Sequence, residues 1–185
     1  STEKSEEEIT NLGSESRFKE FKSSFFYSAS DESQDQVILR TIAGFLNAYD
    51  GIGKLFIGVN DLGDIIGLEN DLNHSPQIKN LDQYQNHIQS RVASAFPKEV
   101  NAMLDYHFHR AKNHTYLEII IPSHDTPIAY NGEFYQRQGV QTRILKGTDV
   151  TDFIARKLSL SPRERKVREY TYDNTINEDL VKNIA

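Results

Sequence analysis

The feature that most constrains the fold is a change in the spacing of apolar residues early in the chain. Over Val37–Tyr49 they recur every three or four residues, which is typical of one buried helix face, and Gly51 can end that helix. Residues 54–59 then form a continuous apolar run, which predicts a buried strand. Residues 61–64 are a polar, glycine-containing turn, which leads into a second expected strand over 65–68.

The rest of the chain carries further helix and strand patterns. Apolar residues on one side of 81–96, with Pro97 just after them, predict a second amphipathic helix. Residues 103–109 and 116–121 are strand-like and are joined by the polar turn 112–114, which predicts an antiparallel hairpin. The remaining expected elements are a short strand over 133–137, a helix from Thr148 to about Lys157, and a final helix over 176–184. Because helices and strands interleave without regular β-α-β units, we expect an α+β fold with a mixed, largely antiparallel sheet and packed helices.

The length of 185 residues suits one domain with a buried core. Residues 1–13 are charged and lack periodic apolar positions, so they are expected to be a flexible acidic segment. We expect the folded domain over 14–158 and a charged C-terminal extension over 159–185. No internal repeat or low-complexity tract divides the chain further.

Composition excludes several classes of protein. The hydrophobic share is 37%, and no run approaches the roughly 18 apolar residues that a membrane-spanning helix needs. The first residues are polar, unlike a secretory signal. There is no Cys, which excludes disulfides and a Cys-ligated zinc site. We therefore expect a cytoplasmic protein with no membrane partner.

The distribution of charge is uneven. The formal net charge is −6, which opposes binding to a phosphate backbone. Residues 133–170, however, hold nine Lys or Arg against five Asp or Glu. This basic segment is compatible with a nucleic-acid partner, and it is equally typical of a solvated surface.

Four motifs follow one another along residues 14–157. They are Glu15-x-x-x-x-Glu20-Phe21-Lys22, Phe45-Leu46-Asn47 at the end of a helix, Gly58-Val59-x-Asp61-x-Gly63-x-Ile65-x-Gly67-Leu68, and Phe134-Tyr135-x-Arg137-x-Gly139. In this order and spacing they resemble the Schlafen AlbA-2 domain family. The resemblance implies a single α+β lobe that binds nucleic acid, as in prokaryotic regulators and defence proteins and in animal Schlafen proteins.

For the nuclease members of that family, the resemblance implies a metal site made of two Glu and one Asp. In this chain these residues are Glu15, Glu20 and Asp61, and Lys22 follows the second Glu. Clustered carboxylates suit Mg²⁺ or Mn²⁺, which can activate a water and offset charge on a phosphate. The implied function is a metal-dependent endoribonuclease that cleaves structured RNA such as transfer RNA. The residues expected to contact phosphates are Lys22, Arg137, Arg143 and Lys146.

The residues alone leave alternatives open. At 3.6 residues per turn, Glu15 and Glu20 would lie about 140° apart on a straight helix, so a bend or a strand must bring them together. Glu20 and Lys22 are also typical of a surface pair, and Asp61 of an ordinary turn. The chain could therefore be a non-catalytic DNA- or RNA-binding module, or an interaction domain. Because Schlafen nucleases use two such lobes, we expect a homodimer here.

Other motifs do not complete a site, and some residues depart from the family pattern. Gly51-Ile52-Gly53-Lys54 lacks the spacing of a phosphate-binding loop, so no ATP is expected. His107, His109 and His114 lack a partner spacing, so no zinc is expected. Asn60 stands where many relatives have Asp, and the link over 50–53 is longer than usual. The side chains of Tyr130 and Tyr135 suit either base stacking or packing.

Overall fold

The computed structural model describes residues 8–160. Its strands are β1 (Lys19–Lys22), β2 (Ile52–Ile57), β3 (Asp105–Ala111), β4 (His114–Pro122), β5 (Tyr135–Gln138) and β6 (Gln141–Ile144). Its helices are α1 (Gln34–Leu46), α2 (Glu69–Leu72), α3 (Leu81–Ala95), α4 (Lys98–Met103) and α5 (Thr148–Ser159). The helix expected over 176–184 lies outside the described residues.

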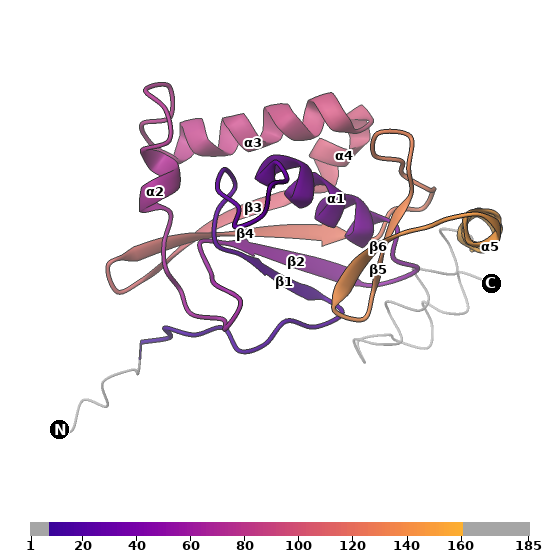
Figure 1. The fold of residues 1–185 in the computed structure, drawn as a ribbon, viewed down its shortest axis with the longest axis horizontal. Coiled ribbons are helices and arrows are strands. Elements are labelled where there is room, and N and C mark those ends of the chain that lie inside the picture. The colour runs from indigo at the N-terminus through magenta and orange to yellow at the C-terminus, as the bar shows by residue number, and fades with distance from the viewer. Residues whose placement is uncertain (1–7, 161–185) are drawn as a thin grey trace, which may run out of the picture.

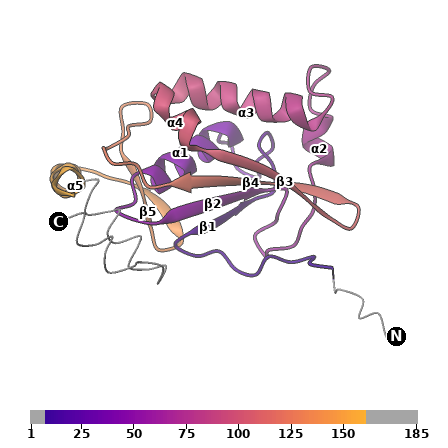
Figure 2. The same ribbon diagram turned by 180° about the vertical axis from the view of Figure 1, so that it is seen from behind.

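The main sheet has the strand order β1-β2-β4-β3, and β5 pairs with β6 in a separate hairpin. β1 and β2 are parallel, whereas the β2–β4 and β3–β4 pairs are antiparallel. Helices α1 and α3 cover one face of this sheet, and the β5–β6 hairpin lies beside the β1 edge (Figures 1 and 2). The predicted α+β class with a mixed, largely antiparallel sheet is confirmed.

One local prediction was wrong, and one unit was not predicted. The unpredicted unit is a single β-α-β connection, in which α1 joins the parallel strands β1 and β2. β1 has only four residues, Lys-Glu-Phe-Lys, so its sequence lacks an apolar run. The strand expected over 65–68 is reduced to one bridge between Val59 and Ile65. Gly67 has a φ of +88°, which is outside the extended region, and the chain then enters α2.

The sheet separates two apolar clusters. The larger one lies between the sheet and helices α1 and α3, and Leu55 and Ile119 belong to it. The smaller one lies on the outer face and contains Phe21, Phe56, Tyr116, Val59 and Ile65. Residues 10–12 contribute to this outer layer, since the Leu12 amide donates to the Gly63 carbonyl at 2.8 Å and the Ile65 amide donates to the Thr10 carbonyl at 3.0 Å.

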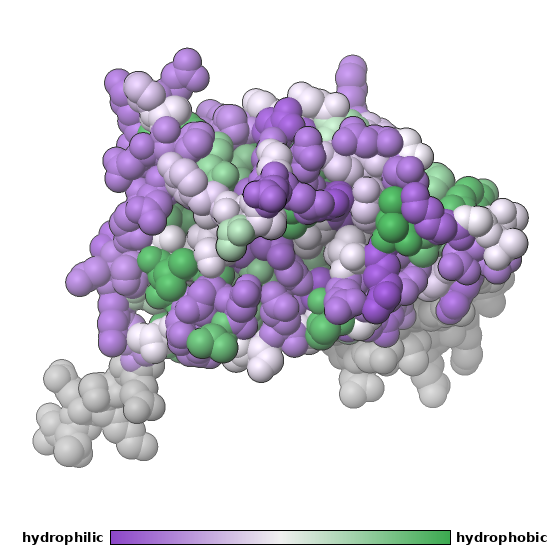
Figure 3. Space-filling model, viewed as in Figure 1, coloured by the Kyte–Doolittle hydropathy of each residue, from purple (hydrophilic) through white to green (hydrophobic). Residues whose placement is uncertain are grey.

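The surface in the view of Figure 3 is mostly hydrophilic, and apolar side chains appear there in small separate patches. Within residues 8–160, no helix combines the length and the apolar character that a membrane crossing requires.

A buried carboxylate fixes the segment after β1. Asp71 is 2% exposed and accepts hydrogen bonds from the Tyr84 hydroxyl at 2.6 Å, the Phe25 amide at 2.8 Å and the Ser24 hydroxyl. Burial, together with the Asp71 charge, raises the pKa of Tyr84 well above its usual value, so Tyr84 remains a donor. Asp71 thereby ties residues 24–25 to α2 and α3.

Asp71→Ala should lower the free energy of unfolding by about 2–4 kcal/mol, because three buried donors lose their acceptor. Urea unfolding followed by circular dichroism measures this change. Asp82→Ala, on the exposed first turn of α3, is the matched control and should cost less than about 1 kcal/mol. Equal effects of the two substitutions would show that Asp71 does not fix this segment.

Candidate functional site

The edge strand β1 carries charged side chains on the face of the sheet that α1 covers. In the parallel register, Glu20 pairs with Leu55 and Lys22 with Ile57, both of which belong to the core beneath α1. Side chains alternate along a strand, so Phe21 between them points to the outer face. Glu20 and Lys22 therefore lie on the same face of β1.

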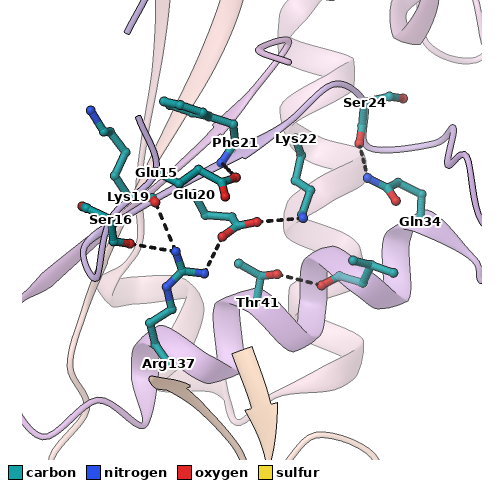
Figure 4. A network of polar contacts seen from close by, with 11 residues as sticks. Glu15, Ser16, Lys19, Glu20, Phe21, Lys22, Ser24, Gln34, Thr41 and Arg137 are labelled. Atoms are coloured by element: carbon teal, nitrogen blue, oxygen red, sulfur yellow. Dashed lines mark hydrogen bonds and ion pairs between the residues drawn. The ribbon is translucent and has the colours of Figure 1, made fainter. Parts of the chain in front are cut away.

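A buried ion pair joins β1 to β5. Arg137 has a side chain that is only 1% exposed, and it donates to Glu20 Oε2. The same guanidinium donates to the Ser16 carbonyl at 2.8 Å and the Lys19 carbonyl at 3.1 Å. Lys22 Nζ lies 2.8 Å from the other oxygen of Glu20 (Figure 4). Both carboxylate oxygens are thus held by cations of the chain itself.

Helix α1 comes close enough to pack against this ion pair. The Arg137 guanidinium lies 5.0 Å from the centre of the Phe45 ring, a cation-π arrangement. Gly44 makes the approach possible, since a Cβ atom there would come within 2.9 Å of Thr142 on β6 and 3.4 Å of the Arg137 amide nitrogen. The ion pair therefore depends on a close contact between α1 and the hairpin.

Glu15 lies beside Glu20, as the family resemblance implied. A tight turn over 16–19, closed by two hydrogen bonds between Ser16 and Lys19, reverses the chain between the two acids. The Glu15 carboxylate accepts the Phe21 amide at 3.0 Å. Burial and the nearby Glu20 charge raise the pKa of Glu15, although the Phe21 amide and Lys22 lower it.

Asp61 lies in a different place. It is exposed in a turn in which Asn60 Oδ1 accepts the amides of Leu62 at 3.0 Å and Asp64 at 2.9 Å. The residues on either side of this turn, Val59 and Ile65, pack in the outer cluster, on the opposite face of the sheet from Glu20.

The residues do not fit a three-carboxylate metal site in this arrangement. Among residues 8–160, no group of three or more His, Cys, Asp or Glu could hold a metal ion. Glu15 and Glu20 are together, Asp61 is apart, and the oxygens of Glu20 are already engaged by Lys22 and Arg137. In this arrangement the three acids therefore do not form a site for Mg²⁺ or Mn²⁺.

A groove of about 440 Å³ opens beside the ion pair, between β1, α1 and the β5–β6 hairpin. Its charged lining residues are three cations and one carboxylate: Lys22, Arg40, Arg137 and Glu20. Arg40 comes from α1, lies 2.6 Å from the exposed Glu32, and stands 5.9 Å from the Tyr135 ring. The residues that line this groove carry a formal charge of +2, in a chain whose formal net charge is −6.

The other expected phosphate contacts are placed differently. Arg137 is buried, and its guanidinium is bound to Glu20 and to the carbonyls of Ser16 and Lys19. Arg143 is exposed and does not line the groove, although its neighbours Thr142 and Ile144 do. Lys146 is exposed beyond β6 and lies 3.7 Å from Glu133.

Sequence reasoning missed Arg40. It stands between the buried residues Leu39 and Thr41, so it was hidden inside a pattern that indicates a core helix. The signal that could have identified Arg40 is that a charged residue interrupts a helix whose other residues on either side follow an apolar pattern. Of the two tyrosines, Tyr135 lines the groove, whereas Tyr130 is buried in the larger core.

The fold and this polar site define an α+β domain with a basic groove at a sheet edge. Residues 15–146 match the family model described as Schlafen, AlbA_2, so the chain belongs to that family. Family membership links it with nucleic acids in general.

Comparison with solved structures shows the same fold. The DIP2311 protein from Corynebacterium diphtheriae has a crystal structure that aligns with a TM-score of 0.55 at 16% sequence identity. The alignment covers 80% of this chain and 25% of that one, so this chain spans about a quarter of the length of that protein. Among curated proteins, none matches this sequence.

Arg137→Met should lower the free energy of unfolding by about 3–5 kcal/mol, because it removes the main partner of the buried Glu20 carboxylate. The double variant Arg137→Met with Glu20→Leu should recover at least half of that loss, since no buried charge remains. Urea unfolding of both variants measures the difference. Arg143→Ala on the exposed face of β6 is the control, within about 0.5 kcal/mol of the wild type. A double variant no more stable than Arg137→Met would contradict this account of the pair.

Proposed function

We propose that this chain binds the phosphate backbone of RNA or DNA in the groove between β1, α1 and the β5–β6 hairpin. The observation that carries the proposal is that the groove gathers three cations around one carboxylate on an acidic chain. Phosphate contacts supply most of the affinity in binding that does not depend on sequence. Membership of the AlbA_2 family supports the same class of partner.

Each cation has a distinct part in this proposal. Lys22 and Arg40 are partly exposed, with side-chain exposures of 22% and 28%, and would contact phosphates directly. The guanidinium of Arg40 can make two parallel hydrogen bonds to one phosphate, in place of those it makes to Glu32. Arg137 would act by holding Glu20, which in turn orients Lys22. Arg143 and Lys146 would contact phosphates that lie outside the groove.

Lys22→Gln and Arg40→Gln should each weaken binding of a fluorescein-labelled single-stranded RNA or DNA dodecamer by about 3–10-fold. Each should also reduce the slope of log Kd against log salt concentration by about 1, because one phosphate contact is lost. Fluorescence anisotropy between about 50 and 200 mM salt measures both quantities. Lys98→Gln, exposed at the start of α4, is the matched control and should change neither. If the two groove variants bind with the wild-type slope, the groove is not the phosphate site.

A metal-dependent endoribonuclease is the second candidate. The observation that favours it is the pairing of Glu15 with Glu20 next to the groove, where burial and the Glu20 charge raise the pKa of Glu15. Under this proposal Glu15, Glu20 and Asp61 would hold Mg²⁺ or Mn²⁺ and structured RNA such as transfer RNA would be cut. Because Asp61 is separate here, the site would have to assemble when RNA binds.

Incubation of the purified protein with transfer RNA and Mn²⁺ or Mg²⁺ tests this candidate. If the site assembles, Asp61→Asn and Glu15→Gln should each lower the cleavage rate by about 100-fold or more, a loss of about 3 kcal/mol of transition-state stabilisation. Asp82→Asn on α3 is the control for a lost surface charge. Equal cleavage by the wild type and Asp61→Asn would reject the three-carboxylate site. Binding without cleavage would reject the nuclease and leave the binding module.

The proposed homodimer would supply a second lobe, and light scattering on the same sample tests it. A mass of twice 21.2 kDa supports the homodimer, whereas a monomer that still cleaves RNA rejects it.

A further inference from the structure

A second hollow lies on the same side of the sheet, where the segment after β1 meets α3. Its volume is about 480 Å³, and three rings form one wall of it. Phe26 stacks on His74 with ring centres 4.0 Å apart and planes 3° from parallel, and the His87 ring lies 5.1 Å from Phe26. We call this hollow the Phe26–His74 pocket.

The lining of this pocket carries no fixed charge. None of its nine lining residues is Asp, Glu, Lys or Arg. Burial lowers the pKa of His87, so that ring is neutral at pH 7. A neutral ligand is therefore favoured over a phosphate or an ion.

Amide side chains also line this pocket, those of Gln77, Gln83 and Asn86. Gln83 uses its oxygen to accept the Lys79 amide at 2.7 Å, which leaves its amide hydrogens available as donors. Within the described part of the chain, the side-chain amides of Gln77 and Asn86 make no hydrogen bond. An aromatic wall beside amide donors and acceptors suits a flat heterocycle with polar edges, which is the chemistry of a nucleobase.

The stacking surface is held in place by the protein before any ligand arrives. Ser24 Oγ accepts the amides of Phe26 and Tyr27, both at 2.9 Å. Asp71 in turn holds Ser24 and the Phe25 amide. The Tyr27 hydroxyl lies 3.1 Å from His74 Nδ1, which fixes the ring at the other side of the stack. Binding of a ligand would therefore cost little conformational entropy, because these side chains are already ordered.

The pocket is adjacent in sequence to the proposed phosphate groove. Phe26 follows Lys22 by four residues, so their Cα atoms are at most about 14 Å apart. We infer that the Phe26–His74 pocket binds one unpaired nucleobase of a strand whose phosphates contact Lys22. This inference rests on the proposed function, since it names a base-binding subsite next to the phosphate groove.

Anisotropy with two labelled probes tests the inference: a single-stranded RNA dodecamer and the same backbone with every base removed. The wild type should bind the complete RNA at least about fivefold more tightly than the abasic backbone, which is the low end of base–aromatic stacking. His74→Ala and Asn86→Ala should each reduce that ratio without changing the salt slope. Lys22→Gln should weaken binding of both probes by the same factor. Leu62→Ala, 76% exposed on the 61–64 turn, is the control.

The outcomes separate the two proposals. The pocket is overturned if the wild type binds the complete RNA and the abasic backbone equally well. It is also overturned if both His74→Ala and Asn86→Ala keep the wild-type ratio of the two affinities. In either case the groove is retained if Lys22→Gln weakens binding of both probes. If the wild type binds neither probe, the groove is rejected, and the pocket is decided by titrating adenosine, which lacks phosphate. Saturable shifts of the His74 and His87 ring signals in nuclear magnetic resonance then support the pocket, and unchanged signals overturn it. Asn86 is exposed on α3, so Asn86→Ala keeps the test valid if His74→Ala fails to fold.

Discussion

The ion pair between Glu20 and Arg137 is the interaction on which the groove depends. It joins residues 117 positions apart and holds the edge strand β1 against the β5–β6 hairpin. Burying two charges is costly, and here the cost is offset by Lys22 and by the carbonyls of Ser16 and Lys19. Because these contacts are directional, they fix one relative position of strand, helix and hairpin. The groove is the space that this position leaves open.

The same ion pair shapes what the site can do. The carboxylate of Glu20 is bound by two cations of the same chain, Lys22 and Arg137. This holds the charge of Lys22 at the edge of the groove. Glu15 completes an acidic pair near this point, while the residues that flank the Asp61 turn, Val59 and Ile65, pack in the outer cluster. The arrangement as it stands suits phosphate binding better than metal chemistry. The neutral Phe26–His74 pocket would add recognition of a base to this binding.

The sequence predicted the parts of the fold with strong local patterns and missed those built from distant residues. Helices α1 and α3 followed from long apolar repeats, and the β3–β4 hairpin from its polar turn. β1 was missed because three of its four residues are charged, and their partners come from elsewhere in the chain. The family motif located Glu15 and Glu20, but spacing alone could not show that Val59 and Ile65, which flank the Asp61 turn, pack on the outer face of the sheet. Phe26 and His74 are 48 positions apart, so no local pattern links them.

Hydrogen–deuterium exchange of the protein with and without a saturating single-stranded RNA tests the central claim directly, because it locates the bound strand on the fold. The account predicts slower exchange along residues 19–27, the part of α1 up to Arg40, and the β5–β6 hairpin. The outer face of the sheet, including the 60–66 turn, should exchange at its free rate. Protection confined to that outer face, with none at β1 or the hairpin, would contradict the account.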